Sequence, residues 1–199
     1  MVASHQPLRR MGLAASLGVA SLTHAPLPVA FSAPVAAAGP TVAEVKAAFL
    51  YNFTKFTEWP VDALPPVAPL LICIAEGSPV HPAIQEVTKG GVVRGHPVVV
   101  RQTKRDGPFD GCHLLYVEGL NEKSALQLLE KLHGAPVLSV SDFNRFAQLG
   151  GSAHLFIEDG RMRFAVNLDA TRRIQLRLSA LFLSLARIVS DDPNYRSPR

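Results

Sequence analysis

Five arginines near the C-terminal end of the chain are the side chains best suited to bind an anion. They are Arg161, Arg163, Arg172, Arg173 and Arg177. Some of them fall in the first turns of a helix that we predict to begin near Leu168 and that Asn167 can cap, where a cation opposes the helix dipole. Two interpretations stay open. The arginines form a solvated rim whose stems cover apolar surface, or they form a pocket for an anionic ligand or an acidic partner surface.

Patterns that indicate catalysis or a bound metal do not occur in the sequence. The glycines in the range 89–95 lack the spacing of phosphate-binding loops, and there is no G-x-S-x-G, H-E-x-x-H or C-x-x-C motif. The segment Ser139–Asp142 is typical of a strand end that leads into a helix cap. We therefore predict no catalytic residue, no metal and no cofactor.

The two cysteines, Cys73 and Cys112, lie 39 positions apart and allow two interpretations. In an oxidising compartment they can form a disulfide, which would stabilise the fold by roughly 4 kcal/mol in the chain-entropy model. The alternative is a pair of buried thiols that pack as small hydrophobic side chains. We predict the disulfide, because the signal peptide predicted at the N-terminus indicates export to an oxidising compartment.

The N-terminus has the parts of a secretory signal peptide. Arg9 and Arg10 precede an apolar run over residues 11–22, which is shorter than the ~20 residues that span a bilayer, and Ala36-Ala37-Ala38 is an A-x-A type cleavage site. We predict a signal peptide over 1–38 and export of the remainder. The signal peptide contains two of the 20 basic residues and none of the 16 acidic residues, so the remainder carries a net charge of about +2. This balance argues against nucleic acid as a partner.

The remaining residues, about 160, suffice for one domain with a core of its own. A capping box at Thr41 and Glu44 predicts a helix that Pro60 ends, and Asp159-Gly160 predicts a tight hairpin. Strands are expected at 70–75, 97–102, 112–117, 137–140, 154–158 and 161–167, and further helices at 81–89 and 122–132. We predict a single α/β domain over 39–190, with a mixed β-sheet of about five to six strands and helices on both faces, followed by a frayed tail over 191–199.

The last expected element is a long helix from about Leu168 to Val189. One apolar face of this helix is suited to pack on the sheet and consists of Ile174, Leu178, Leu181, Leu185 and Ile188. A second stripe consists of Leu176, Ala180 and Leu183. A helix that is apolar nearly all round is either fully enclosed or offers one side to another chain. We expect the second stripe to contact a partner or a second copy of this chain.

Several segments, taken in order, resemble the YfiR family of periplasmic regulatory proteins. They are Lys46–Pro60, Leu71–Ala75, Gly111–Val117, Val137–Asp142 and Gly150–Asn167, followed by the Leu-rich final segment. The resemblance extends from about Val45 to Val189. Each piece is common by itself, and the ordered set is specific.

The resemblance implies a repressor in the periplasm. Such a protein binds the periplasmic sensor region of an inner-membrane diguanylate cyclase and holds the cyclase inactive, which lowers cyclic di-GMP and biofilm formation. It implies a homodimer without catalytic activity, and Cys73 and Cys112 match a cysteine pair of the family. Some members carry a second pair near the glycine doublet, where this chain has no cysteine over 142–151. The alternative is a periplasmic small-molecule binder in which the arginines hold an anion and signal to another partner.

Overall fold

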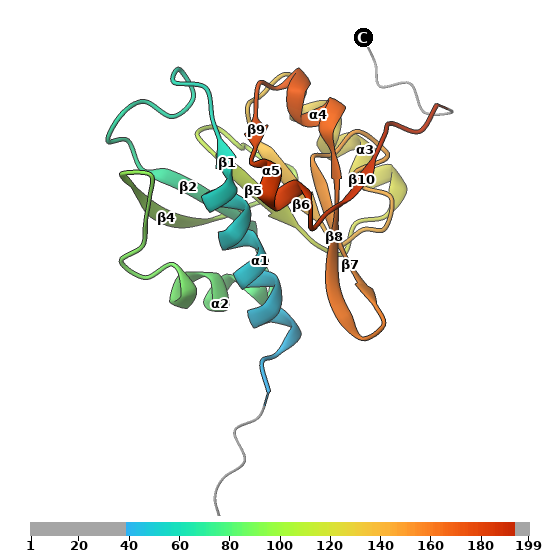
Figure 1. Ribbon diagram of the computed structural model, residues 1–199, viewed down its shortest axis with the longest axis horizontal. Helices are drawn as coiled ribbons and strands as arrows, with labels where there is room; N and C mark the ends of the chain where they lie inside the picture. Colours follow the sequence, from blue (N-terminus) through green and yellow to red (C-terminus); the bar gives the residue numbers. More distant parts are fainter. Residues whose placement is uncertain (1–38, 194–199) are drawn as a thin grey trace, which may run out of the picture. The chain divides into compact units, whose positions relative to one another are not determined.

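The computed structural model describes residues 39–193, and the predicted signal peptide at 1–38 lies outside the described residues. Figure 1 shows the elements in chain order. They are α1 (Val42–Phe56), β1 (Thr57–Glu58), β2 (Leu70–Ala75), α2 (Val80–Val87), β3 (Val92–Val93), β4 (His96–Thr103), β5 (Leu114–Val117), α3 (Glu122–Lys131), β6 (Leu138–Ser141), β7 (Ala153–Glu158), β8 (Arg161–Asn167), α4 (Leu168–Arg173), β9 (Arg177–Leu178), α5 (Ala180–Leu183) and β10 (Arg187–Val189).

A sheet in the order β10-β8-β7-β6-β5-β2-β4-β3 organises these residues. Strands β4, β2, β5, β6 and β7 are parallel, while β7 and β8 form the predicted antiparallel hairpin. The mixed α/β sheet is confirmed, but the predicted number of strands was too low, because the sheet has eight. The two edge strands, β3 and β10, contain two and three residues. Such short segments are too brief to show an alternating pattern in the sequence.

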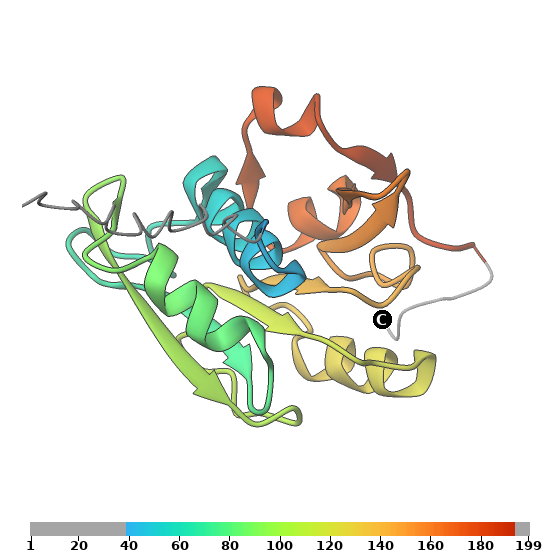
Figure 2. The same cartoon turned by 90° about the horizontal axis from the view of Figure 1, so that it is seen from below.

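Helices cover both faces of the sheet, as predicted. Figure 2 shows α1 and α2 on one side and α3 on the other. Helix α1 begins with the predicted capping box, in which Thr41 accepts from the Glu44 backbone N–H and Glu44 accepts from the Thr41 backbone N–H. Its side chains Leu50 and Phe53 belong to one buried cluster, and Leu128 of α3 belongs to a second cluster. No helix within residues 39–193 is both long enough and apolar enough to cross a membrane.

The predicted long helix from Leu168 to Val189 was wrong, because the segment breaks into four short elements. Helix α4 ends where Gln175 adopts a φ of 59°. The N–H of Leu176 then donates to the carbonyl of Thr171 at 2.9 Å, and that of Gln175 to the carbonyl of Arg172 at 3.0 Å. This pair of hydrogen bonds is a Schellman motif, which ends a helix with one left-handed residue.

Aromatic packing determines where the chain goes after this break. Phe182 of α5 is 4% exposed. Its ring centroid lies 4.6 Å from Phe164 and 5.3 Å from Phe56 in stacked arrangements, and 4.9 Å from Phe53 edge-on. Buried aromatic pairs contribute more than their area alone. Tertiary contacts therefore outweigh the helical periodicity of this segment.

Candidate functional site

A cleft of about 810 Å³ is lined by α3, α4 and the residues after β10. Its apolar lining includes Leu132, Val137 and Ile174. Its charged lining consists of Arg173 and three carboxylates, namely Glu130, Asp191 and Asp192. A volume of this size falls in the range of small-molecule sites.

Asp191 is bound inside this cleft by two residues. Arg173 donates to its Oδ2 from Nη1 at 2.7 Å and to its Oδ1 from Nη2 at 3.3 Å. Asn167 donates to Oδ1 from Nδ2 at 2.6 Å. Burial by itself would raise the pKa of Asp191, but the hydrogen bonds from Arg173 and Asn167 hold that pKa below its ordinary value. The arrangement is a carboxylate held by a guanidinium fork and a fixed amide.

Asn167 occupies the predicted capping position and has a second role. Its Oδ1 accepts from the Ala170 backbone N–H at 2.9 Å, which confirms the predicted helix cap. Its Nδ2 also donates to the carbonyl of Ala147 at 2.8 Å, and the side chain is fully buried. These bonds fix the direction of the Nδ2–H that meets Asp191.

The glycine doublet, Gly150 and Gly151, shapes the neighbouring wall of the cleft. A Cβ atom added at Gly151 would lie 2.3 Å from the ring of Phe146, so only glycine fits there. A Cβ at Gly150 would lie 3.9 Å from Arg173 Nη2. Behind the doublet, the buried hydroxyls of Ser139 and Ser152 hydrogen-bond each other at 3.3 Å and each also accepts a backbone N–H. Their hydrogen bonding is satisfied within the protein.

The five predicted arginines are spread over three elements, and only Arg173 lines the described cavities. Arg161 and Arg163 are exposed on β8. Arg161 lies six residues before the end of that strand, about 20 Å from the start of α4 at the rise of an extended chain. Arg172 forms an ion pair with Asp169 at 3.5 Å. Arg177, on β9, is exposed as well.

The second apolar stripe, which we expected to contact a partner, does not form one exposed face in the structure. Leu176 is 3% exposed, so it is not available to a partner. Ala180 is exposed and Leu183 is half-buried. Three side chains expected to pack on the sheet are instead exposed, namely Leu181 at 69%, Leu185 at 68% and Ile188 at 48%. We call these three side chains the apolar arm.

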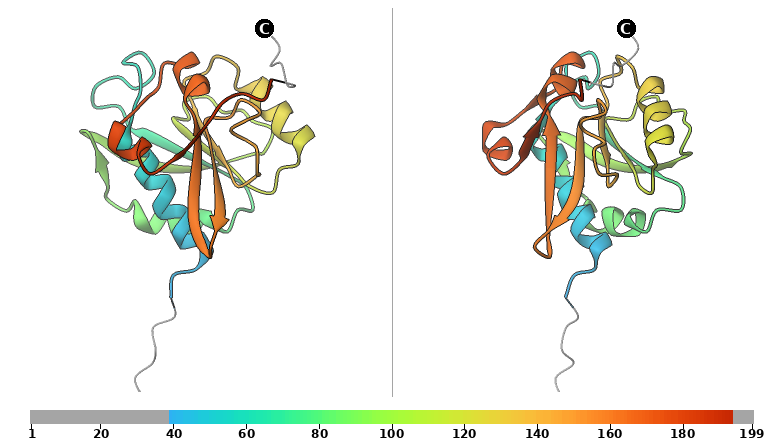
Figure 3. Two further views of the ribbon diagram at one scale, coloured as in Figure 1. Left: turned by 45° about the vertical axis from the view of Figure 1, so that its right-hand side comes forward. Right: turned by 90° about the vertical axis from the view of Figure 1, so that its right-hand side faces the viewer.

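The apolar arm follows the outer edge of the sheet. Strand β10 pairs in parallel with β8 and is the last strand on that side. Figure 3 shows the orange-to-red segment with α5 and β10 on the outer side of the β7–β8 hairpin. Arg187 fixes β10 there, since it forms an ion pair with Glu158 and lies 4.5 Å from the ring centroid of Phe156.

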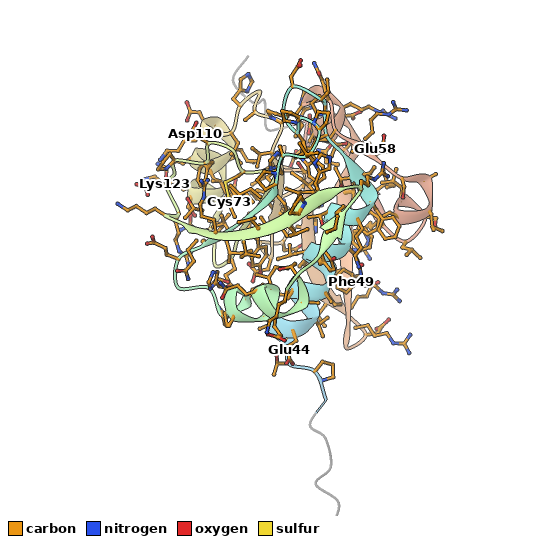
Figure 4. The ribbon with its side chains drawn as sticks, turned by 90° about the vertical axis from the view of Figure 1, so that its left-hand side faces the viewer. Glu44, Phe49, Glu58, Cys73, Asp110 and Lys123 are labelled. Atoms are coloured by element: carbon orange, nitrogen blue, oxygen red, sulfur yellow. A yellow bond between two sulfur atoms is a disulfide. The ribbon has the colours of Figure 1, made fainter. Side chains whose placement is uncertain are left out.

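Cys73 and Cys112 form the predicted disulfide. Both are buried, and Arg101 contacts the bridge, with Nη2 3.3 Å from Cys112 Sγ and 2.7 Å from the carbonyl of Asp110. Figure 4 labels Cys73 and Asp110 on the side of the domain occupied by β2 and the loop before β5. A second cavity of about 500 Å³ reaches Cys112. The bridge joins β2 to the loop directly before β5.

Sequence reasoning missed a charged network at the carboxyl ends of β5 and β6. Lys46 Nζ lies 3.3 Å from Glu118 Oε2 and 2.8 Å from Asp142 Oδ2. Tyr116, which is fully buried, donates to Glu118 at 3.4 Å. Burial would lower the pKa of Lys46, but the two carboxylates raise it above its ordinary value. The three charged residues are far apart in the sequence, so no local signal could have found the network.

The role of Asp191 was also missed, because Asp191 and Asp192 occur in a stretch that we predicted to be a frayed tail. In the structure Asp192 also forms an ion pair, with Arg145 Nη2 at 2.6 Å, and its backbone N–H donates to the carbonyl of Gln148. Asp191 and Asp192 are therefore held against the domain. In the sequence, the two adjacent aspartates were the only indication that this segment contacts the domain.

Taken together, these features define a disulfide-bonded α/β domain with a cleft and an exposed apolar arm. Among the described residues, no group of three or more His, Cys, Asp or Glu side chains is placed to hold a metal ion. The sequence matches the YfiR/HmsC-like family model over residues 43–187. The chain belongs to the YfiR/HmsC-like family.

Proposed function

We propose that this protein is a periplasmic regulator that represses an inner-membrane diguanylate cyclase by binding its periplasmic sensor region. Repression would lower cyclic di-GMP and biofilm formation. Membership of the YfiR/HmsC-like family over residues 43–187 supports this role. The Cys73–Cys112 disulfide supports the compartment, because stable disulfides belong mainly to oxidising environments outside the cytosol.

The observation that carries the binding role is the apolar arm. Leu181 and Leu185 are each more than two-thirds exposed, and Ile188 is about half exposed. Large apolar side chains that gather on a surface mark an interaction site, because water contact with them is unfavourable until a partner covers them. The outer edge of β10 adds backbone groups that another chain can pair with. We propose that the arm contacts the cyclase sensor region.

A pull-down with the purified protein tests the proposal. The bait is the periplasmic region of a diguanylate cyclase whose gene neighbours the gene of this protein. We expect the unmodified protein to bind and the double variant Leu181→Asp, Leu185→Asp to bind at least tenfold more weakly, since two charges would be buried at the contact. Val92→Asp is the matched control, because Val92 is 61% exposed and lies on β3, at the opposite edge of the sheet from β10.

The outcomes separate the two parts of this proposal. Absence of binding by the unmodified protein refutes the regulatory role with that cyclase. Equal binding by the double variant refutes the arm as the contact. We also propose a homodimer, and light scattering on the unmodified protein measures it. A monomer at micromolar concentration would contradict the dimer and leave the cyclase contact to the pull-down.

A further inference from the structure

The carboxylate of Asp191 occupies a position whose Asn167 donor is oriented by contacts other than Asp191 itself. The Nδ2 group of Asn167 is aimed by two other hydrogen bonds of the same side chain, to Ala170 and Ala147. Asn167 is fully buried, so without an acceptor its remaining N–H would be unsatisfied. Arg173 adds a planar pair of donors that matches a carboxylate. Of these donors, the Asn167 amide is fixed by its other hydrogen bonds, so it binds a carboxylate without an ordering cost of its own.

Asp191 comes from the segment after β10, in which Asp192 pairs with Arg145 and its backbone N–H donates to the carbonyl of Gln148. The side chain of Asp191 is 41% exposed, and that of Arg173 is 50% exposed. The segment follows β10, a strand of three residues. Exposed ion pairs contribute little to stability because water competes for both partners. A carboxylate from solution that brings additional contacts can therefore take this position.

We propose that the cleft binds a small carboxylic acid with an apolar body, and that Asp191 acts as an internal competitor for the carboxylate position. The cleft volume of about 810 Å³ suits a small molecule, and its walls include Leu129, Leu149 and Ile174. The nearby hydroxyls of Ser139 and Ser152 already satisfy each other. The lining also includes His133, Glu130 and Asp192. The site thus offers one carboxylate position at Arg173 and Asn167, beside apolar walls and two further carboxylates.

Displacement of Asp191 would affect the position of the apolar arm. Val189, the last residue of β10, pairs with Asn167, and Ile188 pairs with Val166. A ligand that releases Asp191 removes one of the contacts directly after this strand, near the exposed Ile188, while Asp192 keeps its contacts with Arg145 and Gln148. Ligand binding and the position of the arm are therefore linked. The ligand site itself does not rest on the proposed function, since its test contains no cyclase.

The experiment uses 3-phenylpropionate as the probe and 3-phenylpropionamide as the uncharged control of the same shape. Binding is followed by NMR titration of the unmodified protein and three variants. We expect Asp191→Asn to bind 3-phenylpropionate about tenfold more tightly than the unmodified protein, because the competing carboxylate is gone. Arg173→Gln should lose the binding. Arg172→Gln should bind as the unmodified protein does, since Arg172 is on the same helix and pairs with Asp169.

Several results would overturn the proposal. Equal affinity of the amide and the carboxylate would show that the charged position is not used. Equal affinity of Asp191→Asn and the unmodified protein would show that Asp191 does not compete. If 3-phenylpropionate fails to bind Asp191→Asn while a capped Asp-Asp-Pro peptide binds it, the receptor serves a protein segment and the small-molecule site is refuted. Thermal melting of each variant verifies that it is folded.

Discussion

His154 should make the stability of the domain depend on pH in the mildly acidic range. The side chain is on β7 and is 3% exposed. Its Nδ1 accepts the backbone N–H of Ala147 at 3.4 Å, so the neutral ring is the form that fits. Burial, followed by the positive charge of Arg187, lowers the pKa of His154 from 6.5 to about 4. Protonation would place a charge in the core and a proton against the Ala147 N–H.

The sign and size of the effect follow from linkage between protonation and folding. In the unfolded chain His154 titrates near 6.5, and in the folded chain near 4. Between these values the unfolded state binds more protons, so stability is lost as pH falls from about 7 and stops falling below about pH 4. At pH 5 the loss amounts to about 2 kcal/mol relative to neutral pH. That is a substantial part of the 5–15 kcal/mol typical of a domain.

Urea unfolding at pH 7 and pH 5 measures this effect. We expect His154→Gln to reduce the loss of stability between the two pH values by about 2 kcal/mol, since glutamine keeps an acceptor for the Ala147 N–H without titrating. The buried His113, whose pKa is also lowered by burial, keeps its own contribution in this variant. His133→Gln is the matched control, because His133 is exposed and should leave the pH dependence unchanged. If the unmodified protein and His154→Gln lose the same free energy of unfolding between pH 7 and pH 5, the reasoning is refuted.

Two further predictions concern buried interactions. Lys46→Met should lower the free energy of unfolding by about 3 kcal/mol, because the carboxylates of Glu118 and Asp142 would be left close together without a cation; a loss in urea unfolding no larger than that of the exposed Lys55→Met would contradict this. Replacement of both Cys73 and Cys112 by serine should cost about 4 kcal/mol, since the bridge closes a loop of 39 residues; an unchanged calorimetric melting temperature would contradict that reasoning.

The sequence by itself determined the elements whose signals are local. The capping box at Thr41, the apolar run of β2 and the Asp159-Gly160 hairpin were each predicted and are each present. A cap, an alternating pattern or a turn involves residues within a few positions of one another, so the sequence contains all of the interaction. The family resemblance was readable for the same reason, because it rests on the order of such segments, and the match over residues 43–187 confirms it.

Only the tertiary structure decided the path of the segment after Asn167 and the composition of the cleft. The apolar pattern of this segment suited a continuous helix, but in the structure the chain turns at Gln175 and Phe182 stacks on Phe164. Arg173 meets Asp191 across 18 residues, and the other charged network spans still longer separations. Such contacts depend on which strands become neighbours, and strand order is a property of the whole sheet that no local stretch of sequence contains.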